Sequence, residues 1–194
     1  MNLLVNGDAE QGSGGTAEPV GQVVGWGVRQ GAPALVGYDV GDGYPTPDDP
    51  GPAGGAAGGR FFSGGNSPLT TLVQEVALPA SGTTGRGAVD AGRVRYVLSG
   101  WLGGYAGQED GVRLSVEFRD RAGTPLALSV LGPVTAGERG HATAMLERRA
   151  EAAVPPGARS AHVQLSFTRT GAGTSNDGYA DAISLSLAAS GRHS

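Results

Sequence analysis

The feature that most constrains this fold is the alternation of apolar and polar residues in short segments between glycine-rich stretches. Residues 112–119 read V-R-L-S-V-E-F-R, with every second side chain apolar, and residues 93–101 and 161–167 follow a similar pattern. This period of two is typical of a strand that buries one face. The 36 glycines and 12 prolines gather between such segments, where they favour tight turns. The pattern predicts an all-β protein.

Weaker strand patterns extend this prediction along the chain. Asp120 to Gly123 is typical of a hairpin turn, and residues 41–59 read as one long loop. Residues 141–152 are rich in good helix formers, so the residues alone leave a short helix open there. The further predicted strands cover residues 3–5, 20–28, 34–40, 69–78, 126–131 and 183–187.

The apolar positions of the strands predict the hydrophobic core. A chain of 194 residues can bury a substantial core as one domain. We also expect Trp26, directly after Gly25, to be buried. The predicted core residues on the strands are Val94, Tyr96, Leu98, Leu114, Val116, Phe118, Val163, Leu165, Phe167, Ile183 and Leu185.

Oxygen-rich residues follow the first predicted strand and precede the last one. Asp8 and Glu10 come after residues 3–5, while Asp177 and Asp181 come before residues 183–187, with Asp181 at the mouth of that strand. Calcium takes about six to eight oxygen ligands, so the two ends of the chain could meet around this hard cation. Asn6 and Asn176 add amide oxygens to this set. The alternative is that Asn6, Asp8, Asn176 and Asp177 are turn residues, favoured for their local hydrogen bonds.

Several motifs together resemble the galactose-binding-like β-jelly-roll superfamily, which includes many carbohydrate-binding modules. The resemblance implies a single antiparallel β-sandwich of jelly-roll type over residues 1–188, followed by a tail at 189–194. It also implies a strand, and not a helix, within residues 141–152. The motifs are N-L-L-V-N-G-D-A-E at 2–10, G-W at 25–26, V-Q-E-V-A-L at 73–78, S-G-W-L-G-G at 99–104, V-P-P-G-A-R-S-A at 154–161, and residues 176–187.

The same resemblance implies a structural calcium ion where the N-terminal segment meets the last strand. Matched residue by residue, Glu10 and Asp181 are the best candidate ligands, and Asp8 and Asp177 come next. A calcium ion at this place would stabilise the fold without contacting a bound ligand.

The resemblance also implies carbohydrate binding, which needs aromatic faces and planar polar side chains. We expect the candidates to lie together on one sheet face and its rim, with Tyr44 reaching over from the long loop. As alternatives, Trp101 caps the edge of the core, and Arg113 and Glu117 form a solvated pair of little energetic value. The candidate ligand-binding residues are Trp101, Tyr105, Gln108, Arg113, Glu117, His162 and Gln164.

Composition and missing motifs exclude several classes of function. The net charge of −4 disfavours nucleic acid and anionic membranes, and no apolar run approaches the roughly 20 residues of a membrane span. There is no cysteine, no lysine and no G-x-S-x-G motif. We therefore predict no enzyme activity, and the resemblance implies a glycan-binding or lectin-like module.

We expect this module to come from an extracellular or cell-surface protein. The N-terminus lacks a signal-peptide pattern, so we expect that a signal has been trimmed. The alternative function is a structural or protein-interaction jelly roll that binds no sugar. An apolar sheet edge would favour this alternative.

Overall fold

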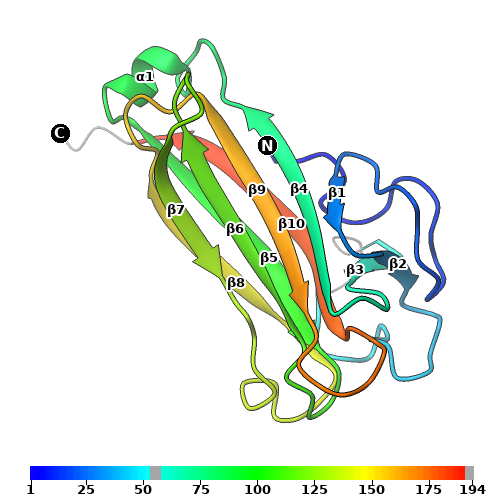
Figure 1. The fold of residues 1–194 in the computed structure, drawn as a ribbon. Coiled ribbons are helices and arrows are strands. Elements are labelled where there is room, and N and C mark those ends of the chain that lie inside the picture. The colour runs from blue at the N-terminus through cyan, green and yellow to red at the C-terminus, as the bar shows by residue number, and fades with distance from the viewer. Residues whose placement is uncertain (53–57, 191–194) are drawn as a thin grey trace.

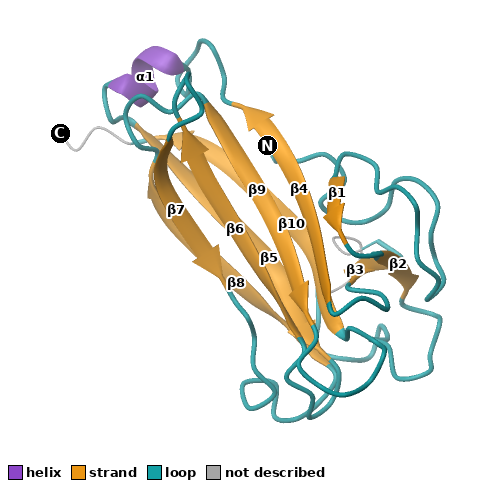
Figure 2. Cartoon of the chain, in the orientation of Figure 1, coloured by secondary structure: helices purple, strands orange, loops and turns teal. Residues whose placement is uncertain are grey.

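The computed structural model describes residues 1–52 and 58–190, which form two five-stranded sheets packed face to face (Figures 1 and 2). All strand pairs within both sheets are antiparallel. The first sheet has the order β1 (Gly27–Gln30), β4 (Leu69–Ala77), β9 (Ser160–Thr168), β6 (Gly111–Arg119) and β7 (Pro125–Leu131). The second sheet has the order β2 (Ala34–Gly37), β3 (Arg60–Ser63), β10 (Gly178–Ala189), β5 (Val94–Gly104) and β8 (Ala144–Ala153). The chain therefore has the predicted jelly-roll β-sandwich fold.

The core lies between the sheets and contains all eleven residues predicted for it. Trp26 is also buried, and its indole N–H donates to the Asn6 carbonyl over 3.1 Å. Buried residues alternate with more accessible ones along β6 and β9, as the period of two predicted. The hairpin turn is confirmed as well, because the Asp120 carboxylate accepts the backbone N–H groups of Ala122 and Thr124.

Several predicted boundaries are wrong. β1 begins only at Gly27, so most of residues 20–28 lie outside any named strand. β3 lies just after the predicted loop of residues 41–59, and the short helix α1 (Arg86–Asp90) was not predicted. Residues 53–57 of that loop lie outside the described residues. β8 is a strand despite its helix-forming composition, because cross-strand packing outweighs intrinsic propensity.

The N-terminal segment lies beside the last strand, as expected, although residues 3–5 are not a strand themselves. The backbone N–H of Leu3 donates to the Leu185 carbonyl over 2.8 Å, and that of Ile183 donates to the Gly7 carbonyl over 2.7 Å. The Asn2 side chain also bonds the backbone of Ile183 and Leu185. Hydrogen bonds thus join the N-terminal segment to β10 without a cation.

The last strand begins earlier than predicted. β10 starts at Gly178, so Asp181 lies within the strand and is fully buried, not at its mouth. A bulge follows between Asp181 and Ser184, where Ala182 has a φ of 48°. The strand pattern of residues 183–187 therefore marks only the part of β10 beyond this bulge.

A second apolar cluster covers the outer face of the second sheet. Its buried members include Phe61 from β3, Met145 from β8 and Tyr179 from β10. Tyr44 packs against this cluster from the long loop, and not over the sheet face where it was expected beside the candidate ligand-binding residues. Among the described residues, no helix is long and apolar enough to cross a membrane.

Candidate binding surfaces and acidic site

Polar side chains line the outer face of the first sheet. In the strand register, His162 of β9 lies between Glu75 of β4 and Glu117 of β6. Gln164 lies opposite Ser115. We call this surface the polar face, and its members are Glu75, Arg113, Ser115, Glu117, Arg119, His162 and Gln164.

A hydrogen-bond network orders part of the polar face. His162 Nδ1 lies 2.8 Å from the Glu75 carboxylate, and Arg119 Nε donates to Glu117 over 2.6 Å. Gln164 donates to the Ser166 hydroxyl over 2.8 Å. Glu117 therefore pairs with Arg119, and the predicted alternative pair of Glu117 with Arg113 is not formed.

Arg113 is exposed on this face, and within residues 1–52 and 58–190 its guanidinium makes no hydrogen bond. The structure thus brings four of the seven candidate ligand-binding residues onto one surface. They are Arg113, Glu117, His162 and Gln164.

The other three candidates do not lie there, so the prediction of a single shared face is wrong. Trp101 lies on the outer face of the second sheet, in register with Asp181 and Glu147. Tyr105 and Gln108 follow the end of β5. Alternation shows which residues of one strand share a face, but it does not show which sheet each strand joins.

Trp101 is half-buried and packs against the second apolar cluster together with Tyr105. The ring centroids of Tyr44 and Tyr179 are 5.9 Å apart, and those of Phe61 and Tyr179 are 5.4 Å apart. Edge-to-face and tilted pairs at such distances stabilise a cluster beyond simple burial. Phe61 and Phe62 are adjacent and point to opposite faces of β3. Two neighbouring apolar residues were the sequence signal for a second apolar cluster, but a search for alternation does not detect them.

The acidic candidates divide into two groups. Burial, together with the charges of Glu10 and Asp8, raises the pKa of Asp181 to about 8. Asp181 accepts hydrogen bonds from the Tyr38 hydroxyl over 2.7 Å and from the Ala182 N–H over 2.6 Å. Asp177 lies elsewhere, beside Asp110, whose carboxylate accepts the Asp177 backbone N–H over 3.0 Å. Burial and the charge of Asp110 raise the pKa of Asp177.

The oxygen donors around Asp181 suit a hard cation chemically, although they do not form one coordination shell in the described residues. The Glu10 carboxylate accepts the N–H groups of Gly59 and Arg60 over 2.9 and 2.7 Å. The Arg60 guanidinium donates to the carbonyls of Glu10 and Gly12. The charges of Glu10 and Asp8 act on the buried Asp181 carboxyl, and a divalent cation would relieve this repulsion.

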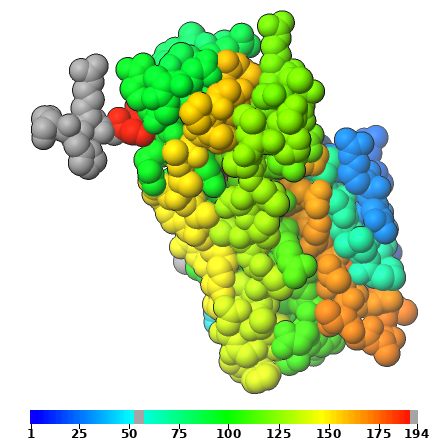
Figure 3. Space-filling view, turned by 60° about the vertical axis from the view of Figure 1, so that its left-hand side comes forward, coloured from blue at the N-terminus to red at the C-terminus, as the bar shows by residue number. Residues whose placement is uncertain are grey.

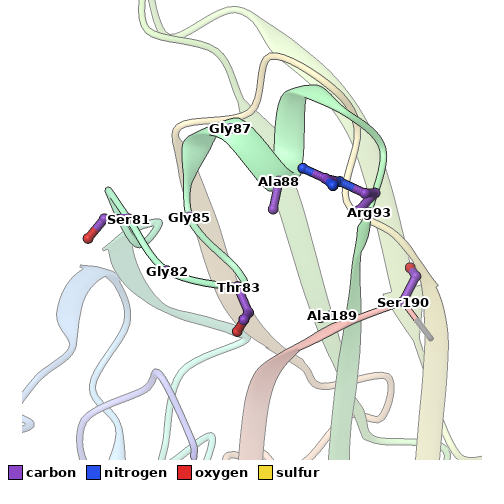
Figure 4. A pocket seen from close by; sticks show the side chains of 9 residues that line it. All are labelled: Ser81, Gly82, Thr83, Gly85, Gly87, Ala88, Arg93, Ala189 and Ser190. Atoms are coloured by element: carbon purple, nitrogen blue, oxygen red, sulfur yellow. The ribbon is translucent and has the colours of Figure 1, made fainter. Parts of the chain in front are cut away.

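Two cavities lie at opposite ends of the sandwich. One of about 700 Å³ lies beside α1 and is lined by residues within 81–88, by Arg93 and by residues 189–190. Figure 4 shows that its polar side chains come from separate segments and do not converge. The other, of about 340 Å³, lies between residues 108–110 and 169–177, and we call it the end-loop cavity.

Three solved structures share the arrangement of this chain. A family 16 carbohydrate-binding module matches with a TM-score of 0.58 and 20% identity, covering 95% of this chain and 99% of that chain. A cyclase from Fischerella sp. TAU, solved with 4-(1H-indol-3-yl)butan-2-one, matches with a TM-score of 0.59 and 12% identity, covering 97% of each chain. The enzymatically active domain of tailspike protein 4 from bacteriophage CBA120 matches with a TM-score of 0.54 and 16% identity, covering 96% of this chain and 21% of that chain.

The TM-scores show a shared fold, while the identities are too low to show more than that. This chain spans about a fifth of the tailspike domain. No protein-family model matches the sequence, and no curated protein matches it. The chain has the jelly-roll fold that the sequence resemblance implied, and it shares this fold with a carbohydrate-binding module.

Proposed function

We propose that this protein is a non-catalytic glycan-binding module and that the polar face is its binding surface. The observation that carries the proposal is the convergence of Arg113, Glu117, His162 and Gln164 on one sheet face of this fold. Guanidinium, carboxylate, imidazole and amide groups supply donors and acceptors for neighbouring sugar hydroxyls. The structural match to a carbohydrate-binding module, which covers nearly the full length of both chains, supports the same class of ligand.

The network on the polar face supports binding of an extended glycan. Glu75 and Arg119 hold His162 and Glu117 in place, which lowers the entropy that a ligand must remove. On the neighbouring strand, Leu128 lies opposite Glu117 and Val130 opposite Ser115. These apolar side chains would contact the C–H groups of a sugar ring beside the polar groups.

A glycan array with matched variants tests this proposal. We expect the double variant Arg113→Ala/Gln164→Ala to lose binding by at least about tenfold, since two hydrogen-bonding groups worth about 1 kcal/mol each are removed. Arg149→Ala is the control, because Arg149 is exposed on β8 in the second sheet. Equal binding by the double variant and the wild type would contradict the proposal.

We propose that this module belongs to an extracellular or cell-surface protein and that it catalyses no reaction itself. Its ligand would then be a polysaccharide or a glycan outside the cell. Two of the structural neighbours are enzymes, so hydrolysis of the bound glycan is the measurement that checks the non-catalytic assignment. We expect the bound glycan to be recovered intact.

We also propose a structural calcium ion held by Asp181, Glu10 and Asp8. The support is the burial of Asp181 beside two further carboxylates at the junction of the N-terminal segment and β10. Their side chains would have to move together to share one ion. A ligand bound only by the folded state stabilises it by about 2.7 kcal/mol at a hundredfold excess over Kd.

Chelation should therefore lower the Tm, and Asp181→Asn should reproduce the loss and abolish the response to chelator. Asp177→Asn is the matched control, because Asp177 lies with Asp110 and away from this group. Metal analysis that finds no bound calcium, together with an unchanged melt in chelator, would remove the site.

A second candidate function, assembly, is favoured by β7. This edge strand contains no charged residue, and Leu126, Leu128 and Val130 are 40%, 63% and 48% exposed. β7 and β8 run along the same side of the molecule (Figure 3). Unprotected edges invite pairing with another chain.

This assembly function predicts a concentration-dependent dimer in sedimentation experiments that Leu128→Glu disrupts. A monomer at every concentration tested would exclude it.

A further inference from the structure

A buried carboxylate orders one wall of the end-loop cavity. Asp110 is only 2% exposed. One of its oxygens accepts the Thr170 backbone N–H over 2.7 Å and the Thr170 hydroxyl over 3.1 Å. Its other oxygen accepts the Asp177 N–H over 3.0 Å. Asp110 therefore joins both ends of the 170–177 segment to the start of β6.

A buried guanidinium orders the opposite wall. Arg139 is 5% exposed and donates to the carbonyls of Ala106 and Gln108, each over 2.7 Å. It also donates to the Gly104 carbonyl at the end of β5 over 2.9 Å. Burying a charge is costly unless it is hydrogen-bonded, and here both buried charges bond the loops around one cavity. The cavity is therefore preorganised.

The lining of this cavity is polar and carries an excess of negative charge. Three carboxylates line it, those of Glu109, Asp110 and Asp177, with one lining cation, Arg169, whose guanidinium donates to the Thr174 carbonyl over 2.7 Å. The buried Arg139 lies behind this lining, so three carboxylates stand against two guanidinium groups. The Gln108 amide also lines it. Carboxylates accept hydrogen bonds from hydroxyl and ammonium groups and repel other carboxylates.

We propose that the end-loop cavity is a second binding site, which takes a single neutral or amino-bearing sugar residue and rejects acidic sugars. Its volume of about 340 Å³ is at the lower end of the range of about 300–1,000 Å³ for small-molecule sites, which suits one such residue. Gln108 and Asp177 contact the sugar hydroxyls. The site shares its ligand chemistry with the polar face but does not require that surface to bind.

Ligand-detected NMR with galactose, glucosamine and glucuronate tests this site on the full chain. We expect binding of galactose or glucosamine and no binding of glucuronate. Gln108→Ala and Asp177→Asn should each weaken binding by at least about fivefold. Gln108 is exposed, so its variant should fold, and an unchanged Tm would verify this. The matched control Arg149→Ala, at an exposed position of β8 in the second sheet, should bind the monosaccharide as the wild type does.

Absence of binding by both galactose and glucosamine would overturn the proposal. So would an affinity of Gln108→Ala and Asp177→Asn equal to that of the wild type. Binding of glucuronate as tight as that of galactose would also overturn it. If Arg113→Ala/Gln164→Ala loses the glycan while monosaccharide binding remains, both sites stand. If the same double variant keeps the glycan, the polar face fails as a binding surface while the end-loop cavity is judged on its own variants.

Discussion

At the residue scale, Trp101 was predicted to share a sheet face with Arg113 and Gln164, but it lies on the other sheet. It is half-buried against the second apolar cluster, on the opposite side of the sandwich from the polar face. We predict that Trp101→Ala lowers the free energy of unfolding by about 2 kcal/mol, less than the about 3–5 kcal/mol for a fully buried aromatic. Glycan binding should stay unchanged, with Trp101→Phe as the control. Loss of binding at an unchanged Tm would instead make Trp101 a sugar-stacking residue.

Asp177 gives a prediction about pH. Burial and the charge of Asp110 raise its pKa in the folded state, so above pH about 4 the folded chain holds this proton more tightly than the unfolded chain. The free energy of unfolding should therefore fall as the pH rises from about 4 through the raised pKa. Asp177→Asn should flatten this slope in urea unfolding at several pH values, while Glu18→Gln, at an exposed position, should not. An unchanged slope in Asp177→Asn would contradict the assignment.

At the element scale, alternation predicted the long strands because β6 and β9 each bury one face. It could not predict β3, a four-residue strand with both phenylalanines buried, since one is covered by the core and the other by the second apolar cluster. Nor could it predict the start of β10 at Gly178, because the bulge after Asp181 interrupts the alternation. The candidate ligand-binding residues lie on two different sheets for the same reason, because the sheet that a strand joins depends on long-range pairing. Local patterns in the sequence do not show this pairing.

β5 offers a test of close strand packing. A Cβ on Gly103 would overlap the Ala144 carbonyl of β8, so Gly103→Ala should cost about 1–3 kcal/mol, as overpacking does. Gly107→Ala is the matched control, because its Cβ would meet only His141 Nδ1 at 3.7 Å. Urea unfolding measures both variants. Equal stability of the two would show that β5 and β8 separate more easily than this packing implies.

At the scale of the whole molecule, the sandwich separates its surfaces by role. The polar face lies on the first sheet, and the second apolar cluster lies on the outer face of the second sheet. The end-loop cavity lies between the loops that follow β5 and β9. A fold of this kind hosts many functions, so the position of a bound glycan decides between them.

Backbone amide chemical-shift mapping with a glycan selected from the array tests the central claim most directly. We predict that the shifted amides lie along β4, β6 and β9, around Arg113, His162 and Gln164. The same residues should shift less in Arg113→Ala/Gln164→Ala. Shifts confined to the second sheet around Trp101 would contradict a binding surface on the polar face, as would the absence of any shift with every glycan on the array.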